Sequence, residues 1–126
     1  MDVPTDRHYT KEHEWALLEA DGTVRVGVSD FAQHELGDVI YVELPAAGAR
    51  VTQSEQMGEI ESVKAVSDLF SPVTGEVLEV NDGIKDKPEL VNNDPYDAGW
   101  LIRVRIDSTD ELSNLLDAGQ YQQMTE

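Results

Sequence analysis

Lys64 is the residue whose position in this chain best suits covalent chemistry. It is the only basic residue between Arg50 and Lys85, a window that also holds seven carboxylates. The pattern around it predicts two short strands joined by a tight turn, with Lys64 at the tip. An exposed ammonium group on a flexible stem is accessible to an acylating enzyme. The alternative is an ordinary solvated surface lysine, because exposed lysines are common.

Residues 58–72 are expected to form this hairpin, with Pro72 closing its second strand. An apolar set of side chains is expected to face the core, and a polar set to face water. The apolar set is Ile60, Val63, Val66, Leu69 and Phe70, and the polar set is Glu59, Glu61, Ser67 and Asp68. A half-buried hairpin of this kind would present Lys64 on a rigid turn.

The remaining elements follow from periodicity, turn signals and capping residues. Ser29 is expected to cap a short helix over 30–36 that ends at Gly37. Ser108 and Glu111 form a capping-box pattern that predicts a C-terminal helix. Strands are expected over 13–19, 23–28, 38–44, 57–62, 75–80 and 100–106, with a loop and room for one helical turn over 85–99 and a loosely held stretch over 1–7.

The residues around the predicted hairpin resemble a known attachment segment. ESVKA at 61–65, followed by SPVTGEV at 71–77, is similar to the lipoyl-attachment segment of the glycine cleavage H-protein family. Further blocks resemble that family in the same order, namely HEW at 13–15, GDVIYVELP at 37–45, NDPY at 93–96 and GWL at 99–101. The resemblance covers residues 9–121, and several blocks in register make it specific.

The resemblance implies a mainly β fold, a flattened β-barrel or sandwich of the biotinyl/lipoyl-carrier type with quasi-twofold halves and short helices, one of them C-terminal. We expect a single lipoyl-carrier domain over 1–126, with a core over 9–106 and a C-terminal helical segment over 108–121. The 126 residues, 40% of them hydrophobic, suffice for one core.

An internal repeat agrees with two similar halves. VSD at 28–30 recurs at 66–68, and GDVIYV at 37–42 recurs as GEVLEV at 75–80, both with an offset of 38 residues. In that arrangement the Lys64 hairpin stands opposite residues 29–36.

By resemblance, Lys64 carries lipoate in amide linkage, and the chain is a carrier without catalytic activity of its own. It would take the aminomethyl group of glycine from a pyridoxal-phosphate decarboxylase and pass it to a tetrahydrofolate-dependent aminomethyltransferase. A dihydrolipoamide dehydrogenase with FAD and NAD would then reoxidise it. A lipoate-attaching enzyme is a further implied partner, and the chain is expected to be a monomer in the bacterial cytoplasm.

The resemblance also points to residues near the lipoyl arm. Glu14 and Asp68 match positions where the family has carboxylates, and Glu12 stands where the family has a serine. Some relatives have a cleft histidine at the position of Glu35. His34 lies one residue before that position, so we do not assign it the role of that histidine. Ordinary surface acids are the alternative interpretation, since the chain has 26 Asp and Glu residues. Both tryptophans, Trp15 and Trp100, are expected in the core.

Composition excludes several function classes. A net charge of −17 argues against binding to nucleic acid or anionic membranes. No cysteine is present, so the chain has no disulfide and no thiolate nucleophile or ligand. No run approaches the roughly 18 apolar residues of a membrane-spanning helix, and no targeting segment is seen. The histidines, His8, His13 and His34, do not have the spacing of metal ligands.

Three alternatives stay open at this point. A lipoyl domain serving a 2-oxoacid dehydrogenase complex normally has aspartate before the modified lysine, whereas Val63 precedes Lys64 here. A biotin carrier normally has methionine on both sides, which Val63 and Ala65 do not match. The third alternative is a binding module that never carries lipoate.

Overall fold

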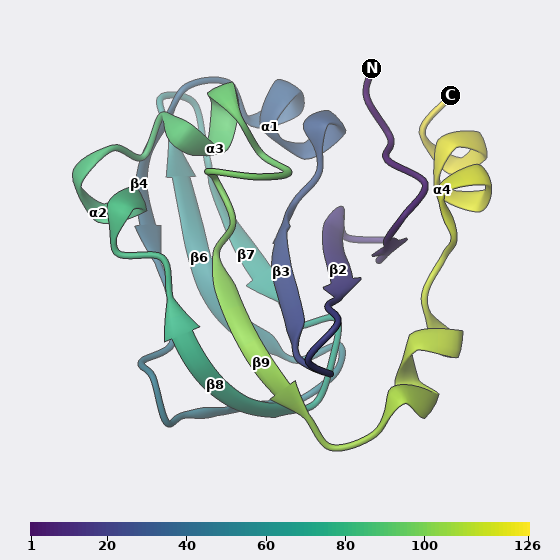
Figure 1. Ribbon diagram of the computed structural model, residues 1–126. Helices are drawn as coiled ribbons and strands as arrows, with labels where there is room; N and C mark the ends of the chain where they lie inside the picture. The colour runs from purple at the N-terminus through teal and green to yellow at the C-terminus, as the bar shows by residue number, and fades with distance from the viewer.

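The computed structural model describes residues 1–126 and consists mainly of two antiparallel sheets (Figure 1). The larger sheet has the strand order β1-β2-β3-β9-β8-β5, and the smaller has the order β4-β6-β7. The larger contains β1 (His8–Tyr9), β2 (Glu14–Leu18), β3 (Val24–Val28), β5 (Arg50–Val51), β8 (Gly75–Val80) and β9 (Ile102–Ile106). The smaller contains β4 (Val39–Glu43), β6 (Gln56–Ser62) and β7 (Val66–Phe70). The predicted sandwich-like β fold is confirmed.

Short helices cover the ends of the sheets. They are α1 (Asp30–Leu36), α2 (Gly83–Asp86), α3 (Leu90–Asn93), the 3₁₀ helix η1 (Thr109–Asn114) and α4 (Ala118–Thr125). Helices α1 and α3 contact each other and lie at the end where β6 turns into β7, whereas α4 lies against β1 (Figure 1). No helix is long and apolar enough to cross a membrane.

Alternating apolar side chains build the main core between the two sheets. Val24, Val26 and Val28 of β3 are at most 2% exposed, and they pack in the same cluster as Ile60 of β6 and Leu69 of β7. Alternation places every second residue of a strand on one face, so one face of each sheet is buried. Burial of apolar surface of this kind is the main force that holds the sheets together.

A second cluster lies between the β1–β2 edge and helix α4. It consists of Tyr9, Trp15, Ala118 and Tyr121, all at most 8% exposed. Gly27 makes room for it, because a Cβ atom there would lie 2.5 Å from the Trp15 ring. Trp15 is therefore a core residue, as predicted. Its burial fixes the position of strand β2, which begins at Glu14, one of the acids that the sequence placed near the lipoyl arm.

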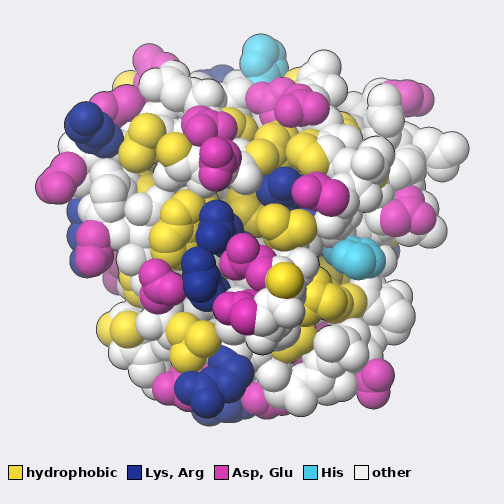
Figure 2. All heavy atoms as spheres, viewed as in Figure 1, with side chains coloured by type: hydrophobic (Ala, Val, Ile, Leu, Met, Phe, Trp, Pro, Cys, Tyr) yellow, Lys and Arg dark blue, Asp and Glu magenta, His cyan; other side chains and the backbone are white.

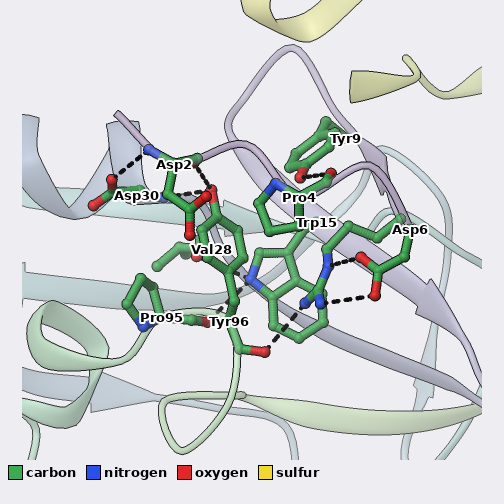
Figure 3. Close-up of polar contacts among 10 residues, drawn as sticks. Asp2, Pro4, Asp6, Tyr9, Trp15, Val28, Asp30, Pro95 and Tyr96 are labelled. Carbon is green, nitrogen blue, oxygen red and sulfur yellow. Dashed lines mark hydrogen bonds and ion pairs between the residues drawn. The ribbon is translucent and has the colours of Figure 1, made fainter. Parts of the chain in front are cut away.

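The N-terminal stretch is not loosely held, contrary to the prediction (Figure 3). Asp2 N–H donates to Asp30 at 2.9 Å, and the hydroxyl of Tyr96 donates to Asp2 O at 2.7 Å. The Arg7 guanidinium lies 4.7 Å from the Trp15 ring centroid and donates to the Tyr96 carbonyl. These contacts come from distant residues, so the polar composition of 1–7 carries no signal of them.

The C-terminal helix begins later than predicted. Ser108 caps only the 3₁₀ helix η1, by accepting from Asp110 N. The capping box forms instead at Asp117 and Gln120, which open α4. Leu116 exchanges two 2.8 Å backbone hydrogen bonds with Tyr9, and the extended backbone that this requires ends the first helical stretch. A tertiary contact thus overrides a local helix signal.

The loop predicted over 85–99 contains α3 and the end of α2. Each of these single-turn helices is anchored by one buried apolar side chain, Ile84 in α2 and Val91 in α3.

The internal repeat of the sequence is only partly repeated in the structure. Its second block corresponds to strands β4 and β8, whereas its first block corresponds to the end of β3 in one half and to the start of β7 in the other.

Candidate functional site

The turn between β6 and β7 is pinned by Ser62. Ser62 N–H donates to Ala65 O at 2.8 Å, and Ser62 Oγ accepts from the N–H groups of Lys64 and Ala65 at 3.3 and 3.2 Å. Val63 N–H donates to Asp38 O at 3.0 Å, which ties the tip to the start of β4. Serine at the first position of a turn was the available signal for this role. The result is an exposed lysine on a well-fixed tip.

The stem of Lys64 lies over the end of helix α1. Gly37 ends that helix with φ 76°, and a Cβ atom on it would lie 3.1 Å from Lys64 Cε. Gly37 thus supplies both a left-handed backbone and the space for the lysine stem. The contact between Gly37 and the Lys64 stem confirms that the hairpin stands opposite the 29–36 segment.

Two apolar residues beside Lys64 do not face the core as predicted. Val63 is 66% exposed and Val66 is 59% exposed, whereas Ile60 and Leu69 are buried. Val66 pairs with Glu61 across the hairpin, and directly opposed residues share one face of a sheet. The pairing therefore turns Val66 outward with Glu61, and Val63 lies in the turn itself.

A cleft of about 350 Å³ lies between α1, the start of β2 and the hairpin. Its apolar wall includes Leu36, Ile60 and Leu69, and Ala65 brings the lysine turn to its edge. The three acidic residues singled out from the sequence, Glu12, Glu14 and Asp68, all line this cleft, together with Glu35 and His13. Four carboxylates and no lysine or arginine line it, so the cleft favours a ligand with an apolar body and a positive charge.

Glu14 is the buried carboxyl of the cleft and is 1% exposed. Its Oε1 accepts from Thr10 Oγ1 at 2.6 Å, and its Oε2 accepts from Phe70 N at 3.1 Å, so it joins β2 to β7. Burial raises the pKa of Glu14 to about 7 despite these hydrogen bonds. The buried carboxyl therefore keeps its proton to a higher pH than an exposed glutamate does, and a nearby cation would favour its ionised form.

Asp68, Glu12 and Glu35 are more exposed and lie at the rim of the cleft. Asp68 accepts a hydrogen bond from Gln56 Nε2 at 3.1 Å. A second hollow of about 380 Å³, which includes Lys11 and Gln53 in its lining, lies on the other side of Glu12 and Glu14. It contains no residue of the lysine turn, so the cleft beside Ala65 is the better candidate.

His13 forms another part of the cleft wall, and it adopts a left-handed backbone with φ 76°. Its Nδ1 lies 2.8 Å from the hydroxyl of Tyr121, which in turn lies 2.6 Å from Ser29 Oγ. Burial raises the pKa of Tyr121 to about 12 and lowers the pKa of His13. Tyr121 therefore keeps its proton, and the imidazole tends to stay neutral.

Two proton arrangements satisfy these three side chains. Ser29 Oγ accepts from Ala32 N and still has a proton and a second lone pair, so either Ser29 or Tyr121 can be the donor between them. We expect the arrangement in which Ser29 donates to Tyr121 and Tyr121 donates to His13 Nδ1, which leaves the imidazole proton on Nε2. Sequence reasoning missed this network because Tyr121 is 108 residues from His13.

The other expected residues are placed away from the chemistry. His34 is exposed and does not line the cleft. Trp100 is only half-buried, with the Arg25 guanidinium 5.3 Å from its ring centroid, so it is not a fully buried core residue. No group of three or more histidine, aspartate and glutamate side chains could hold a metal ion.

Charge is distributed unevenly over the molecule. Figure 2 shows acidic side chains over the whole visible face, with basic side chains interleaved among them near its centre. On the larger sheet Arg25 and Arg103 pair with Glu19 at 3.3 and 3.6 Å, and Arg103 also pairs with Glu79 at 3.3 Å. These arginines therefore form ion pairs with glutamates. No lysine or arginine lines the cleft to pair with its carboxylates.

Comparison with known proteins finds relatives of one family along nearly the entire chain. The family described as glycine cleavage H-protein matches residues 7–126. The glycine cleavage system H protein of Thermus thermophilus is 53% identical over 100% of this chain and 98% of its own length. That of Mycobacterium tuberculosis strain H37Ra is 52% identical over 95% of this chain and 94% of its own length.

A solved structure agrees with these relatives. The crystal structure of a glycine cleavage system H protein from Mycobacterium marinum superposes with a TM-score of 0.89 at 41% identity. It covers 96% of this chain and 97% of that one. The chain therefore belongs to the glycine cleavage H-protein family.

Proposed function

We propose that this chain is the lipoyl carrier of the glycine cleavage system, with lipoate attached to Lys64. The observation that carries the proposal is a single exposed lysine on a pinned turn, at the edge of a cleft lined by carboxylates. The family to which the chain belongs supports the same role. The chain would act as a shuttle and would have no catalytic activity of its own.

The residues present fit a lipoyl arm. Leu36, Ile60 and Leu69 offer an apolar wall to a hydrocarbon chain, and Glu14 and Asp68 offer carboxylates to an ammonium group. When attached, lipoate supplies a cyclic disulfide that is reduced as it accepts the aminomethyl group of glycine. A chain without cysteine could take part in sulfur chemistry in this way.

The cleft residues would hold the charged cargo and keep water from it. An ammonium group beside Glu14 would favour the ionised carboxylate, so Glu14 would release its proton as the cargo arrives. The resulting charge-assisted hydrogen bond is stronger than a neutral one. Asp68 and Glu12 would add negative charge at the rim, where solvent screens them more strongly.

The proposed partners are the pyridoxal-phosphate glycine decarboxylase, the tetrahydrofolate-dependent aminomethyltransferase, dihydrolipoamide dehydrogenase and a lipoate-attaching enzyme. The net charge of −17 supports steering of the carrier towards basic surfaces of these enzymes. We propose a single carrier domain that acts as a monomer, and the bacterial source of the curated relatives favours the bacterial cytoplasm.

The proposal is tested by reconstitution with a bacterial glycine decarboxylase. Lipoylated chain should support exchange of labelled bicarbonate into the carboxyl group of glycine, and Lys64→Arg should abolish it. Lys85→Arg is the matched control, because Lys85 is also exposed but lies in α2 away from the cleft. No exchange with lipoylated wild-type chain, together with acylation by a 2-oxoacid dehydrogenase, would favour the alternative lipoyl-domain function.

A further inference from the structure

Strand β4 contains a bulge at Ile40. Val39 faces Ser62 and Tyr41 faces Glu61, so two residues advance on β4 while one advances on β6. A bulge of this kind re-aims side chains relative to the regular alternation. Ile40 and Tyr41 are accordingly 49% and 56% exposed, while Val39 and Val42 on either side are buried. The bulge therefore presents two successive apolar side chains to solvent.

These side chains belong to a larger apolar surface around Lys64. Tyr41, Glu61 and Val66 are in register across the three strands of the smaller sheet, so Tyr41 and Val66 flank Glu61 on one face. Val63 lies in the turn, beside Lys64. We call Ile40, Tyr41, Val63 and Val66 the hairpin patch. It contains four of the seven large apolar side chains that the chain exposes, and such concentrations mark protein–protein contacts.

We propose that the hairpin patch is the docking surface for the enzyme that attaches lipoate to Lys64. This inference rests on the proposed function. The acceptor atom in that reaction is Lys64 Nζ itself, so the attaching enzyme must enclose the lysine side chain and touch the surface next to it. The other partners act on the far end of the attached arm and have no such requirement.

Charge around the patch indicates what the enzyme surface must contain. Glu43, Glu59 and Glu61 of the smaller sheet and Asp38 at the base of β4 border the patch. These four acids outnumber the nearby bases, which are Lys64 and Lys85 of helix α2, the helix that contacts β4. An apolar hollow with a basic border is the complementary surface, with the apolar contacts carrying most of the affinity.

In the attachment step the chain supplies only the amine. Deprotonated Lys64 Nζ attacks the acyl carbon of lipoyl-adenylate, which the enzyme forms from lipoate and ATP. The new C–N bond is an amide, the acyl C–O bond to phosphate breaks, and AMP leaves with that electron pair. The surplus proton on nitrogen goes to solvent. No oxidation or reduction takes place.

The test measures lipoylation of the unmodified chain by a bacterial lipoate–protein ligase, with lipoate and ATP. Tyr41→Ser combined with Val66→Ser should raise KM for the chain about ten- to hundredfold, since each loses an apolar contact, and should leave kcat within about twofold. The dissociation constant of unmodified chain for the ligase, measured by calorimetry, should rise by the same factor. Leu18→Ser is the matched control, because Leu18 is 43% exposed on β2, outside the patch.

Two further variants separate docking from folding. Tyr41→Phe keeps the ring and should dock as wild type does. Val63→Ser, at a 66% exposed turn position, should raise KM with no change in the thermal unfolding midpoint. Equal KM values for the double variant and Leu18→Ser would overturn the inference.

Which enzyme docks on the hairpin patch is tested separately, on chain that is already fully lipoylated. The double variant should receive the aminomethyl group from the decarboxylase with unchanged KM. An equal loss in that assay would show that the patch serves the decarboxylase, and would also overturn the inference. Failure of wild-type chain to gain lipoate at all would instead contradict the proposed function.

Discussion

The Nδ1 atom of His13 lies 2.8 Å from the hydroxyl of Tyr121, and this contact joins the C-terminal helix to the wall of the cleft. Tyr121 is fully buried and stacks on Tyr9 with a centroid distance of 4.6 Å. His13 has a left-handed backbone conformation, which residues other than glycine adopt less readily. Helix α4 thus holds a strained cleft residue in place, although it lies far from Lys64 in the chain.

Tyr121→Phe is expected to release His13 from the Nε2 tautomer that we expect in the wild type. The variant leaves Ser29 and His13 without a buried hydroxyl partner, which should lower the free energy of unfolding by about 1–2 kcal/mol. Nitrogen NMR of the imidazole should show His13 protonated mainly on Nε2 in wild type and as a tautomer mixture in the variant. Gln123→Ala, on an exposed face of α4, is the control and should change neither quantity. An unchanged tautomer in Tyr121→Phe would contradict the assignment.

Glu14→Gln is expected to change how stability depends on pH. The pKa of Glu14 is about 7 in the folded chain and near 4.5 when unfolded. Below pH 4.5 both states hold the proton. As the pH rises from 4.5 through 7, the unfolded state ionises first, so the wild type loses stability on the order of 3 kcal/mol from this group.

Glutamine at this position cannot ionise and should not show that loss. Urea unfolding at pH 4.5, 6 and 7.5 gives the difference in unfolding free energy between Glu14→Gln and wild type at each pH. This difference should shift in favour of the variant as the pH rises. A constant difference would mean that the pKa of Glu14 is not raised by burial.

Glu14→Ala and Asp68→Ala are expected to shorten the time for which the carrier keeps its aminomethyl cargo. Loss of a carboxylate near the ammonium group should ease its deprotonation. The lone pair of the free amine would then break the C–S bond with the thiolate as leaving group, and water would hydrolyse the released one-carbon unit to formaldehyde and ammonia. Ammonia release from loaded chain, with no transferase present, is the measurement. Glu89→Ala, an exposed acid next to α3, is the control. Equal release rates in all four proteins would show that the two cleft acids have no role in retention.

Association with the decarboxylase is expected to depend strongly on salt. The chain has a net charge of −17, and screening shortens electrostatic interactions to about 10 Å at 0.1 M salt. Raising the salt concentration should slow association much more than it speeds dissociation. Stopped-flow association rates that stay flat from low to high salt would indicate that the acidity serves solubility alone.

Local signals predicted the elements that carry Lys64. Ser29 and Gly37 set the bounds of α1 because each satisfies backbone groups within one turn of the helix. The alternation of β6 and β7 predicted the hairpin and the burial of Ile60 and Leu69. It did not predict the outward Val66, because the pairing register depends on the turn geometry rather than on hydrophobicity alone.

Long-range contacts account for what the sequence did not predict. The bridge between Tyr9 and Leu116 ends the first C-terminal helix, and no local pattern contains that information. The contact of Tyr121 with His13 and the exposure produced by the bulge at Ile40 likewise depend on partners on other elements. Family resemblance identified Glu14 as a cleft acid, but its burial and raised pKa emerge only from the packing of β2 against β7.

We propose Lys64 as the attachment site of lipoate, and the mass of the modified chain tests this most directly. Chain produced with lipoate and a lipoate-attaching enzyme should gain the mass of one lipoyl group, and peptide mapping should place it on Lys64. Lys64→Arg should gain no mass, whereas variants at Lys11, Lys85 or Lys87 should be modified as wild type is. A lipoyl group on any of those three lysines, or a Lys64→Arg chain that still gains the mass, would contradict the claim.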